Sequence, residues 1–225
     1  FITDSTLYSA WAEVTKNEMI HAESYSEIVR VGFEDPSVVI DDCHAVHEAM
    51  DRSSIVTDVM EEAYMMSHAC ALGKVPNDEK TYDAAFMFVV ALFALERLQF
   101  ATSFAITFSI AKEKKYIPIG LLVQKIAVDE LEVHSPLDRY ILLQEMKDPR
   151  GLAAYKRNRK RIAAIFDDVL RSEHEWVDYL FKDGRHLPGR ETPDMIKNWA
   201  LYLGQGLHKT MGTLDLSKYT YSDKN

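Results

Sequence analysis

Hydrophobic residues recur along most of this chain at the three- and four-residue spacing of helices that bury one face. Short polar segments rich in proline, glycine or aspartate separate these stretches, and Asp4 is expected to cap the first helix. The predicted helices cover about 5–31, 38–50, 54–72, 80–112 and 119–146, then the stretch from DPRG (148–151) to KDGRHLPG (182–189), and finally 193–211. Strand signals do not occur in the sequence. We therefore predict an all-α bundle, with a single domain over 1–225.

The most apolar stretch, residues 86–111, is long enough to cross a membrane. Glu96, Arg97 and Gln99 lie near its middle, where charged groups are costly in lipid. A helix that is apolar nearly all round, with one acid at its centre, is typical of the core of a large bundle. The sequence therefore predicts a buried core helix and no membrane contact.

Composition and charge exclude other classes of protein. Hydrophobic residues make up 47% and charged residues 27%, as in folded globular proteins, and the net charge of -9 disfavours nucleic acid as a partner. The basic run KRNRKR (156–161) is interpreted as the solvent face of a helix. Cys43 and Cys70 have no C-x-x-C spacing, which fits a reducing, cytoplasmic environment. The start at Phe1 and the polar end YTYSDKN suggest a fragment cut at both ends.

The first chemical motif is NEMIHAESYSEIV in the first predicted helix. Glu18 and His21 are three residues apart, so both project from one face and can bind the same ion. Tyr25 follows His21 by four residues and lies on that face one turn along. An E-x-x-H pair alone is a weak signal, because a surface pair gives the same pattern.

Two further motifs lie in apolar helices. A buried lone carboxylate such as Glu96 is unfavourable unless it is paired, protonated or bound to metal. Arg97 points about 100° away on the helix, so the alternative to metal is a distant arginine. In QKIAVDELEVH, Glu130 and His134 are four residues apart on one face, with Asp129 alongside. Each motif alone is again weak.

Together the three motifs predict a two-metal centre. Ferritin-like bundles bind two metals through a lone carboxylate from each of two helices and a Glu-x-x-His from each of two others. Carboxylate oxygens with a few imidazoles suit iron or manganese. Phe100, Phe104 and Ile126 fall on the ligand-bearing faces, where they could shield Tyr25 from water, although ordinary core packing gives the same pattern.

The same segments resemble, in order and over nearly the whole chain, the small (β) subunits of class I ribonucleotide reductases. NEMIHAESYSEIVR is similar to the family's Glu-x-x-His segment with its radical tyrosine, and DPSVVIDD to the segment that follows. ALERLQFATSFAITFSIA resembles the helix with the lone glutamate ligand, IAVDELEVH the second ligand helix, and EWVDYLFKDG a later helix end. The resemblance implies a ferritin-like helical bundle.

The resemblance also implies a function. Two iron ions, or manganese, would react with O₂ and oxidise a tyrosine to a radical. The radical would then pass to a cysteine of a separate large catalytic subunit, which reduces ribonucleoside diphosphates to deoxyribonucleotides for DNA replication. A homodimer is expected on the same ground.

The roles that this resemblance assigns fall into three groups. The metal ligands would be Glu18, His21, Glu96, Glu130 and His134. Tyr25 would be the radical site, and Asp129 the acid that is hydrogen-bonded to a ligand histidine on the radical-transfer path. Phe100, Phe104 and Ile126 would form the pocket around the radical.

The chain departs from the family's pattern in two places. The family has Asp-Glu-x-x-His where this chain has Asp-Glu-x-x-x-His, so the extra residue requires a π-type bulge or a changed ligand. Glu130 is preferred to Glu132 because four-residue spacing keeps it on the face of His134. The family's sixth ligand, an aspartate, comes from a preceding helix, and Asp4 is too close to Glu18 to replace it. The family's C-terminal docking tail is also expected to be missing.

Other interpretations remain open on sequence alone. The same ligands would serve another two-metal oxidase or an iron-storage protein, and a helical scaffold would need no metal. His44 and His47 imitate a zinc pair, but the acids around them suggest an exposed helix. Glu173, His174 and Glu175 are interpreted as surface charge at a helix end. The sequence has no glycine-rich phosphate loop, so nucleotide binding by this chain is not indicated.

Overall fold

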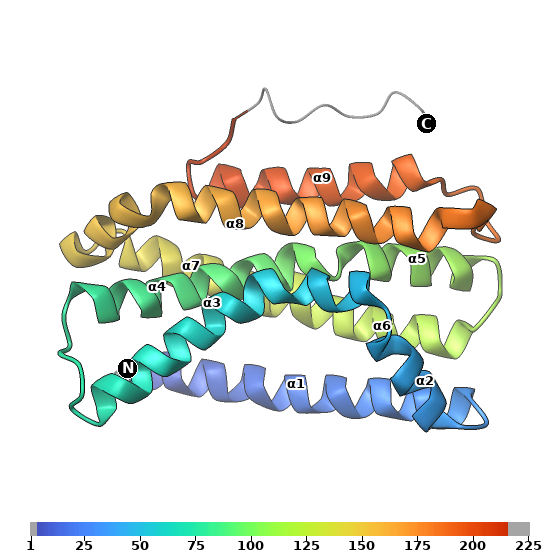
Figure 1. Cartoon of the computed structure of the whole chain (residues 1–225), viewed down its shortest axis with the longest axis horizontal. Helices are drawn as coiled ribbons and strands as arrows, with labels where there is room; N and C mark the ends of the chain where they lie inside the picture. The colour runs from blue at the N-terminus through green and yellow to red at the C-terminus, as the bar shows by residue number, and fades with distance from the viewer. Residues whose placement is uncertain (1–3, 216–225) are drawn as a thin grey trace.

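The computed structural model describes residues 4–215, which form long helices joined by short loops (Figure 1). These residues contain no strand, so the predicted all-α class is confirmed. Phe1 and the polar end YTYSDKN lie outside the described residues.

A series of α-helices accounts for most of residues 4–215. In chain order they are α1 (Ser5–Gly32), α2 (Pro36–His44), α3 (His47–Ala71), α4 (Glu79–Ala94), α5 (Ala101–Lys112), α6 (Ile117–Asp129), α7 (Ser135–Glu145), α8 (Pro149–Phe181) and α9 (Pro193–Thr210). Two π-helices, η1 (Leu95–Gln99) and η2 (Glu130–His134), and a 3₁₀ turn, η3 (Lys182–Gly184), complete the set. Side chains cap several of them: Asp4 accepts a hydrogen bond from the Leu7 amide at 2.8 Å, and Asp148 from the Arg150 amide at 2.8 Å.

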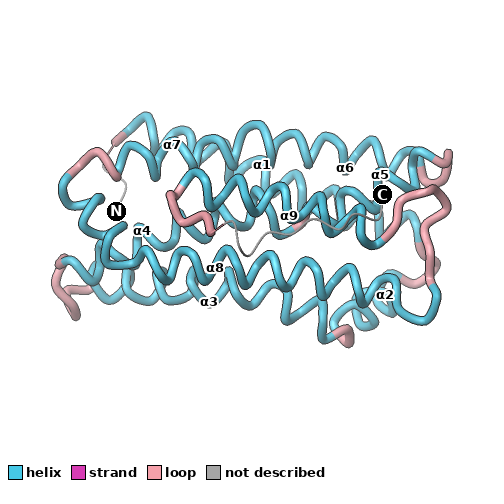
Figure 2. Tube along the Cα trace, turned by 90° about the horizontal axis from the view of Figure 1, so that it is seen from above, coloured by secondary structure: helices cyan, strands magenta, loops and turns pink. Residues whose placement is uncertain are grey.

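The long helices run roughly along the long axis of the molecule. In Figure 1, α1 forms one edge, α8 and α9 form the opposite edge, and the α4–η1–α5 rod lies between them. In the view from above, most of the connecting loops gather at the two ends of the bundle (Figure 2). Contacts join α4 to α3, α7 and α8, and α5 to α6 and α9. The α4–η1–α5 rod is therefore the centre of the bundle.

Most of the hydrophobic core surrounds this central rod. Its largest cluster joins α3, α4, α7, α8 and α9 and includes Val90, Leu98, Leu142 and Phe166, each fully buried. A smaller cluster of Phe104, Val123, Ile126 and Ala127 lies beside α1. By length and composition the Glu79–Lys112 segment could cross a membrane, but 61% of its most apolar window is buried inside the protein. Core packing therefore accounts for its apolar character, as the sequence predicts.

Helix α1 is attached to the bundle much more lightly. His21 is its one buried residue, and the helix contacts mainly α6 and α2. Trp11 anchors its first half by an edge-on contact with Phe88, with ring centroids 6.1 Å apart. The residues that α1 brings to the centre of the bundle therefore depend on a small number of contacts.

The break between the second and third helices lies earlier than predicted. The pattern predicts it at residues 51–53, but α2 ends at His44, and Val46 takes an extended backbone before α3 begins. Ser53 and Ser54 do not cap a new helix. Their hydroxyls donate to carbonyls three residues back, at 2.9 and 2.8 Å, a bond that serine makes inside a continuous helix.

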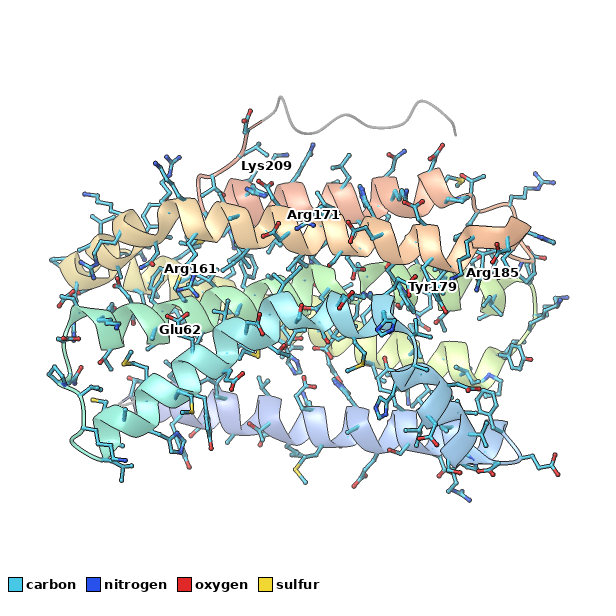
Figure 3. All side chains as sticks on the ribbon, viewed as in Figure 1. Glu62, Arg161, Arg171, Tyr179, Arg185 and Lys209 are labelled. Carbon is cyan, nitrogen blue, oxygen red and sulfur yellow. The ribbon has the colours of Figure 1, made fainter. Side chains whose placement is uncertain are left out.

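The basic run at 156–161 lies on the outer surface of α8, as the sequence predicts. Arg157 pairs with Glu79 and Asp83 of α4 at 2.9 and 2.6 Å. Arg161 pairs with Glu62 of α3, and the two side chains lie where α3 and α8 run side by side (Figure 3). These charges join helices at the surface and need no external partner.

Two matched leucine substitutions test this division into core and surface. Leu142 on α7 is fully buried, whereas Leu121 on α6 is 57% exposed. We expect Leu142→Ala to lower the free energy of unfolding by about 2–5 kcal/mol, because it removes buried methyl groups and leaves a cavity. Leu121→Ala should change it by less than about 0.5 kcal/mol. Urea unfolding measures both, and equal losses would contradict the assigned core.

Candidate metal centre

Three segments far apart in the sequence bring acids and an imidazole together at the centre of the bundle. Glu18 comes from α1, Glu96 from η1, and Glu130 and His134 from η2. Each offers one ligand atom, and these four atoms lie within 4.8 Å of one another. A group of this kind can hold a metal ion.

His21 lies next to this group and is held in a defined orientation. Its Nε2 is 3.0 Å from Oδ2 of Asp129. The family resemblance implies a hydrogen bond between Asp129 and a ligand histidine but does not say which one. Because the bond to Asp129 places the ring proton on Nε2, the Nδ1 lone pair faces inward. Nδ1 is buried without a hydrogen-bond partner, although Oε1 of Glu130 is 3.0 Å away. Two electron-pair donors that face each other in this way suit a cation between them.

Glu96 is buried in η1, in the middle of the most apolar part of the chain. Burial, the hydrogen bond to Glu130 and the charges of Glu130 and Glu18 raise the pKa of its carboxyl to about 11. In the metal-free protein, therefore, a proton on Glu96 separates the two carboxylates. A divalent cation would relieve the same repulsion more strongly.

Glu130 and His134 occupy the two ends of η2, so the extra residue in Asp-Glu-x-x-x-His is accommodated by a π-helical turn. Nδ1 of His134 is 2.7 Å from Oε2 of Glu130 and 3.1 Å from Oε1 of Glu18. Burial acts to lower the pKa of His134, but these two acids outweigh it and raise that pKa to about 9. Glu132 is exposed and lies outside the cluster.

Tyr25 lies one turn beyond His21 on α1, with 43% of its surface exposed. Partial burial and the charges of Glu130 and Glu18 raise the pKa of its phenol to about 12. The phenol is therefore protonated at neutral pH and lies within the electrostatic reach of the acidic cluster.

The three predicted pocket residues do not share one environment. Phe104 and Ile126 are buried in the small hydrophobic cluster, against which Ile28 of α1 packs. Phe100 is 42% exposed and lines a cavity of about 420 Å³ that also reaches Glu96 and His134. The structure thus places Phe100 beside the acids rather than in the small cluster.

Several residues near the centre were not foreseen from the sequence. Asp138 is buried, lines the same cavity and accepts a hydrogen bond from Trp11. Burial raises the pKa of its carboxyl to about 8. The sequence signal that could have identified Asp138 is its spacing of four residues from His134, which places both on one helix face. Asn17 of α1 approaches Nε2 of His134 at 3.4 Å.

The sequence predicted a surface position for Glu173 and for the histidine pair His44 and His47, and the structure confirms it only for the histidines. Glu173 is fully buried and pairs with Arg52, so its interpretation as surface charge is wrong. Local sequence could not reveal this, because the partner comes from another helix. His44 and His47 are exposed, as expected, and belong to different helices.

Acids and imidazoles that converge from separate helices on the centre of a bundle define a ferritin-like protein with a metal-capable site. A solved structure from Bacillus halodurans, described as a "putative class I ribonucleotide reductase", has the same fold, with a TM-score of 0.72 over 94% of this chain and 70% of that one, at 18% identity. A family model described as "Ribonucleotide reductase, small chain" matches residues 4–220. The chain belongs to that family.

Curated relatives agree with this assignment. Ribonucleoside-diphosphate reductase 1 subunit beta of Salmonella typhimurium is 27% identical over 77% of this chain and 50% of its own length. Ribonucleoside-diphosphate reductase subunit beta of Enterobacteria phage T4 is 26% identical over 86% of this chain and 55% of its own length. The chain therefore spans about half the length of these relatives.

The protonation pattern of the centre predicts how stability depends on pH. Between about pH 7 and pH 9, the folded metal-free protein keeps protons on Glu96 and His134 that the unfolded chain has released. Stability should therefore fall as pH rises, by up to about 1.4 kcal/mol per pH unit for each retained proton. Glu96→Gln should make this fall shallower. Urea unfolding with a chelator, at several pH values, measures the slope.

The control for this slope is Glu191→Gln. Hydrogen bonds from Ser109 and Lys112 lower the pKa of Glu191 to about 2, so its contribution to stability is lost only as pH falls below about 4.5. Glu191→Gln should leave the slope above pH 7 unchanged. If Glu96→Gln also leaves it unchanged, Glu96 does not hold the proton.

Proposed function

We propose that this chain is the metal-binding, radical-generating part of a ribonucleoside-diphosphate reductase small subunit. The observation that carries the proposal is the convergence of Glu18, Glu96, Glu130 and His134 within 4.8 Å. Membership of the small-chain family supports it. The substrate of the whole enzyme would be a ribonucleotide bound by a separate large subunit, and the small subunit would form a homodimer.

The metal ligands would be the five residues of the sequence prediction, Glu18, His21, Glu96, Glu130 and His134. The donor set is mainly carboxylate oxygen with two imidazole nitrogens, which suits iron and also manganese. When bound, two such ions would activate O₂ and supply the oxidising power for a one-electron oxidation of tyrosine. Trp11 and Asp138 would hold α1 against the centre from outside the ligand set.

Tyr25 would lose one electron and its phenolic proton to become the radical. Its raised pKa keeps the phenol protonated until that oxidation. Phe104 and Ile126 would protect the radical on the side of the small cluster, and Phe100 on the side of the cavity. Asp129 would fix the His21 imidazole through its 3.0 Å hydrogen bond and connect the centre to the radical-transfer path.

The choice between the two glutamates of η2 can be tested by metal content. Glu130 is buried beside His134, whereas Glu132 is exposed. In the complete protein, we expect Glu130→Ala to lower bound iron from about two ions per chain to one or fewer. Glu132→Ala should bind iron as the wild type does. Anaerobic Fe(II) loading followed by metal analysis gives the answer, and the reverse pattern would make Glu132 the ligand.

The radical assignment can be tested by electron paramagnetic resonance of the complete protein loaded with Fe(II) and exposed to O₂. Tyr25→Phe should abolish the tyrosyl signal. Tyr140→Phe, at a site on α7 that is 61% exposed, should retain it. A signal that persists in Tyr25→Phe would assign the radical elsewhere. Iron binding with no radical in the wild type, together with oxidation of a small organic substrate, would favour another two-metal oxidase.

A further inference from the structure

The α4–η1–α5 rod is broken between η1 and α5. Gln99 is the last residue of η1, Phe100 has φ -108° and ψ 3°, and α5 begins at Ala101. Backbone groups at such a break lose regular helical partners and need others when they are buried. The break lies three residues after Glu96, so its geometry sets how η1 is rotated about its axis.

A buried ion pair from two other helices supplies hydrogen-bond partners to the backbone at this break. Arg52 of α3 donates through Nη2 to the carbonyl oxygen of Gln99 and, at 2.9 Å, to Oε2 of Glu173 of α8. Its Nε also donates to Glu173. Oε2 of Glu173 accepts a hydrogen bond from the Thr102 hydroxyl at 2.6 Å and one from the Thr102 amide at 3.4 Å. The pair therefore supplies a donor before the break and an acceptor after it.

Further contacts fix the side chains around the pair. The Gln99 amide donates back to the Arg52 carbonyl at 3.0 Å, and Arg52 Nη1 donates to the Ser103 hydroxyl at 3.0 Å. The guanidinium carbon of Arg52 lies 5.5 Å from the ring centroid of Phe100, which lines the cavity next to Glu96. Arg52 and Glu173 are 7% and 0% exposed, so solvent does not compete for these bonds.

The location of the Arg52–Glu173 pair suits it to hold η1 in place, beyond any contribution that it makes to the stability of the fold. Both α3 and α8 belong to the large core, through Val56 and Phe166 among others. The pair therefore ties η1 to the best-packed part of the bundle and not to the lightly attached α1. We propose that Arg52 and Glu173 are positioning residues that fix the rotation of η1 and so direct the Glu96 carboxylate into the metal centre. The inference rests on the proposed metal function.

Arg52→Lys is the variant that tests the inference, with Arg161→Lys as its matched control. Both replace an arginine that joins α3 and α8 through a glutamate, but the side chains of the Arg161–Glu62 pair are 41% and 47% exposed, whereas those of Arg52 and Glu173 are buried. A lysine keeps the charge at position 52 but lacks the fork that reaches Glu173 and the Gln99 carbonyl together. Both variants are made in the complete protein.

The first measurement is hydrogen–deuterium exchange of the metal-free protein. Arg52→Lys should increase exchange in peptides that cover residues 95–104 by about tenfold or more, with little change in α9. Arg161→Lys should leave 95–104 unchanged. Equal protection of 95–104 in wild type and Arg52→Lys would overturn the inference, as would a uniform increase over all helices, since that indicates only lost global stability.

The second measurement is binding of Mn(II) alone, followed by the paramagnetic resonance signal of the free ion. Arg52→Lys should weaken one binding site by about tenfold or more, the usual effect of losing a group that orients a ligand. Arg161→Lys should bind as the wild type does, and equal binding by Arg52→Lys would overturn the inference. If the wild type binds no Mn(II), the metal proposal fails, while the exchange measurement still tests whether the pair holds η1.

Thr102→Val covers the case in which Arg52→Lys does not fold. It keeps the shape of the side chain and removes the hydroxyl, which donates to Glu173 at 2.6 Å and accepts from Nη2 of Arg52 at 3.5 Å. We expect a several-fold weakening of Mn(II) binding and faster exchange confined to residues 95–104. Unchanged values in both measurements would overturn the inference.

Discussion

The structure is organised around the burial of acidic groups in a helical bundle. Glu96 and Glu130 lie inside the protein, and Glu18 reaches the same point from the edge. Carboxylates this close repel one another, and removal from water adds to the penalty. In the metal-free protein, a proton on Glu96 and the charge of the protonated His134 imidazole oppose this repulsion. A divalent cation would neutralise the same repulsion with two positive charges at one point.

Two π-helical turns bring the acids to that point. Glu96 lies in η1 and Glu130 begins η2, and the two turns are in contact. A π-turn inserts one residue into a helix and disturbs its backbone hydrogen bonds, so it persists only where neighbouring groups support it. Arg52 and Glu173 give that support after η1. Buried polar residues outside the centre are thus part of what shapes it.

Sequence periodicity predicted the helical class, and spacing within helices predicted much of the centre. Glu96 was recognisable because an acid in an apolar helix needs a partner, and Glu130 because it shares a face with His134. The burial of Glu173 was not predictable, since its partner Arg52 lies 121 residues away in the sequence. The early end of α2 was also missed: the break was predicted at residues 51–53, where α3 is continuous. Both features depend on contacts between distant parts of the chain, which local sequence patterns do not reveal.

The centre joins two parts of the molecule that are packed very differently. Glu96, Glu130 and His134 belong to helices next to the core, whereas Glu18, His21 and Tyr25 come from α1, in which His21 is the one buried residue. Trp11 and the His21–Asp129 bond are among the few contacts that hold α1 in place. A cation bound by ligands from both parts would act as a cross-link between them, and its binding free energy would add to the stability of the fold. The position of Tyr25, four residues after His21 on the same helix, would then be fixed by the metal centre that is proposed to oxidise it.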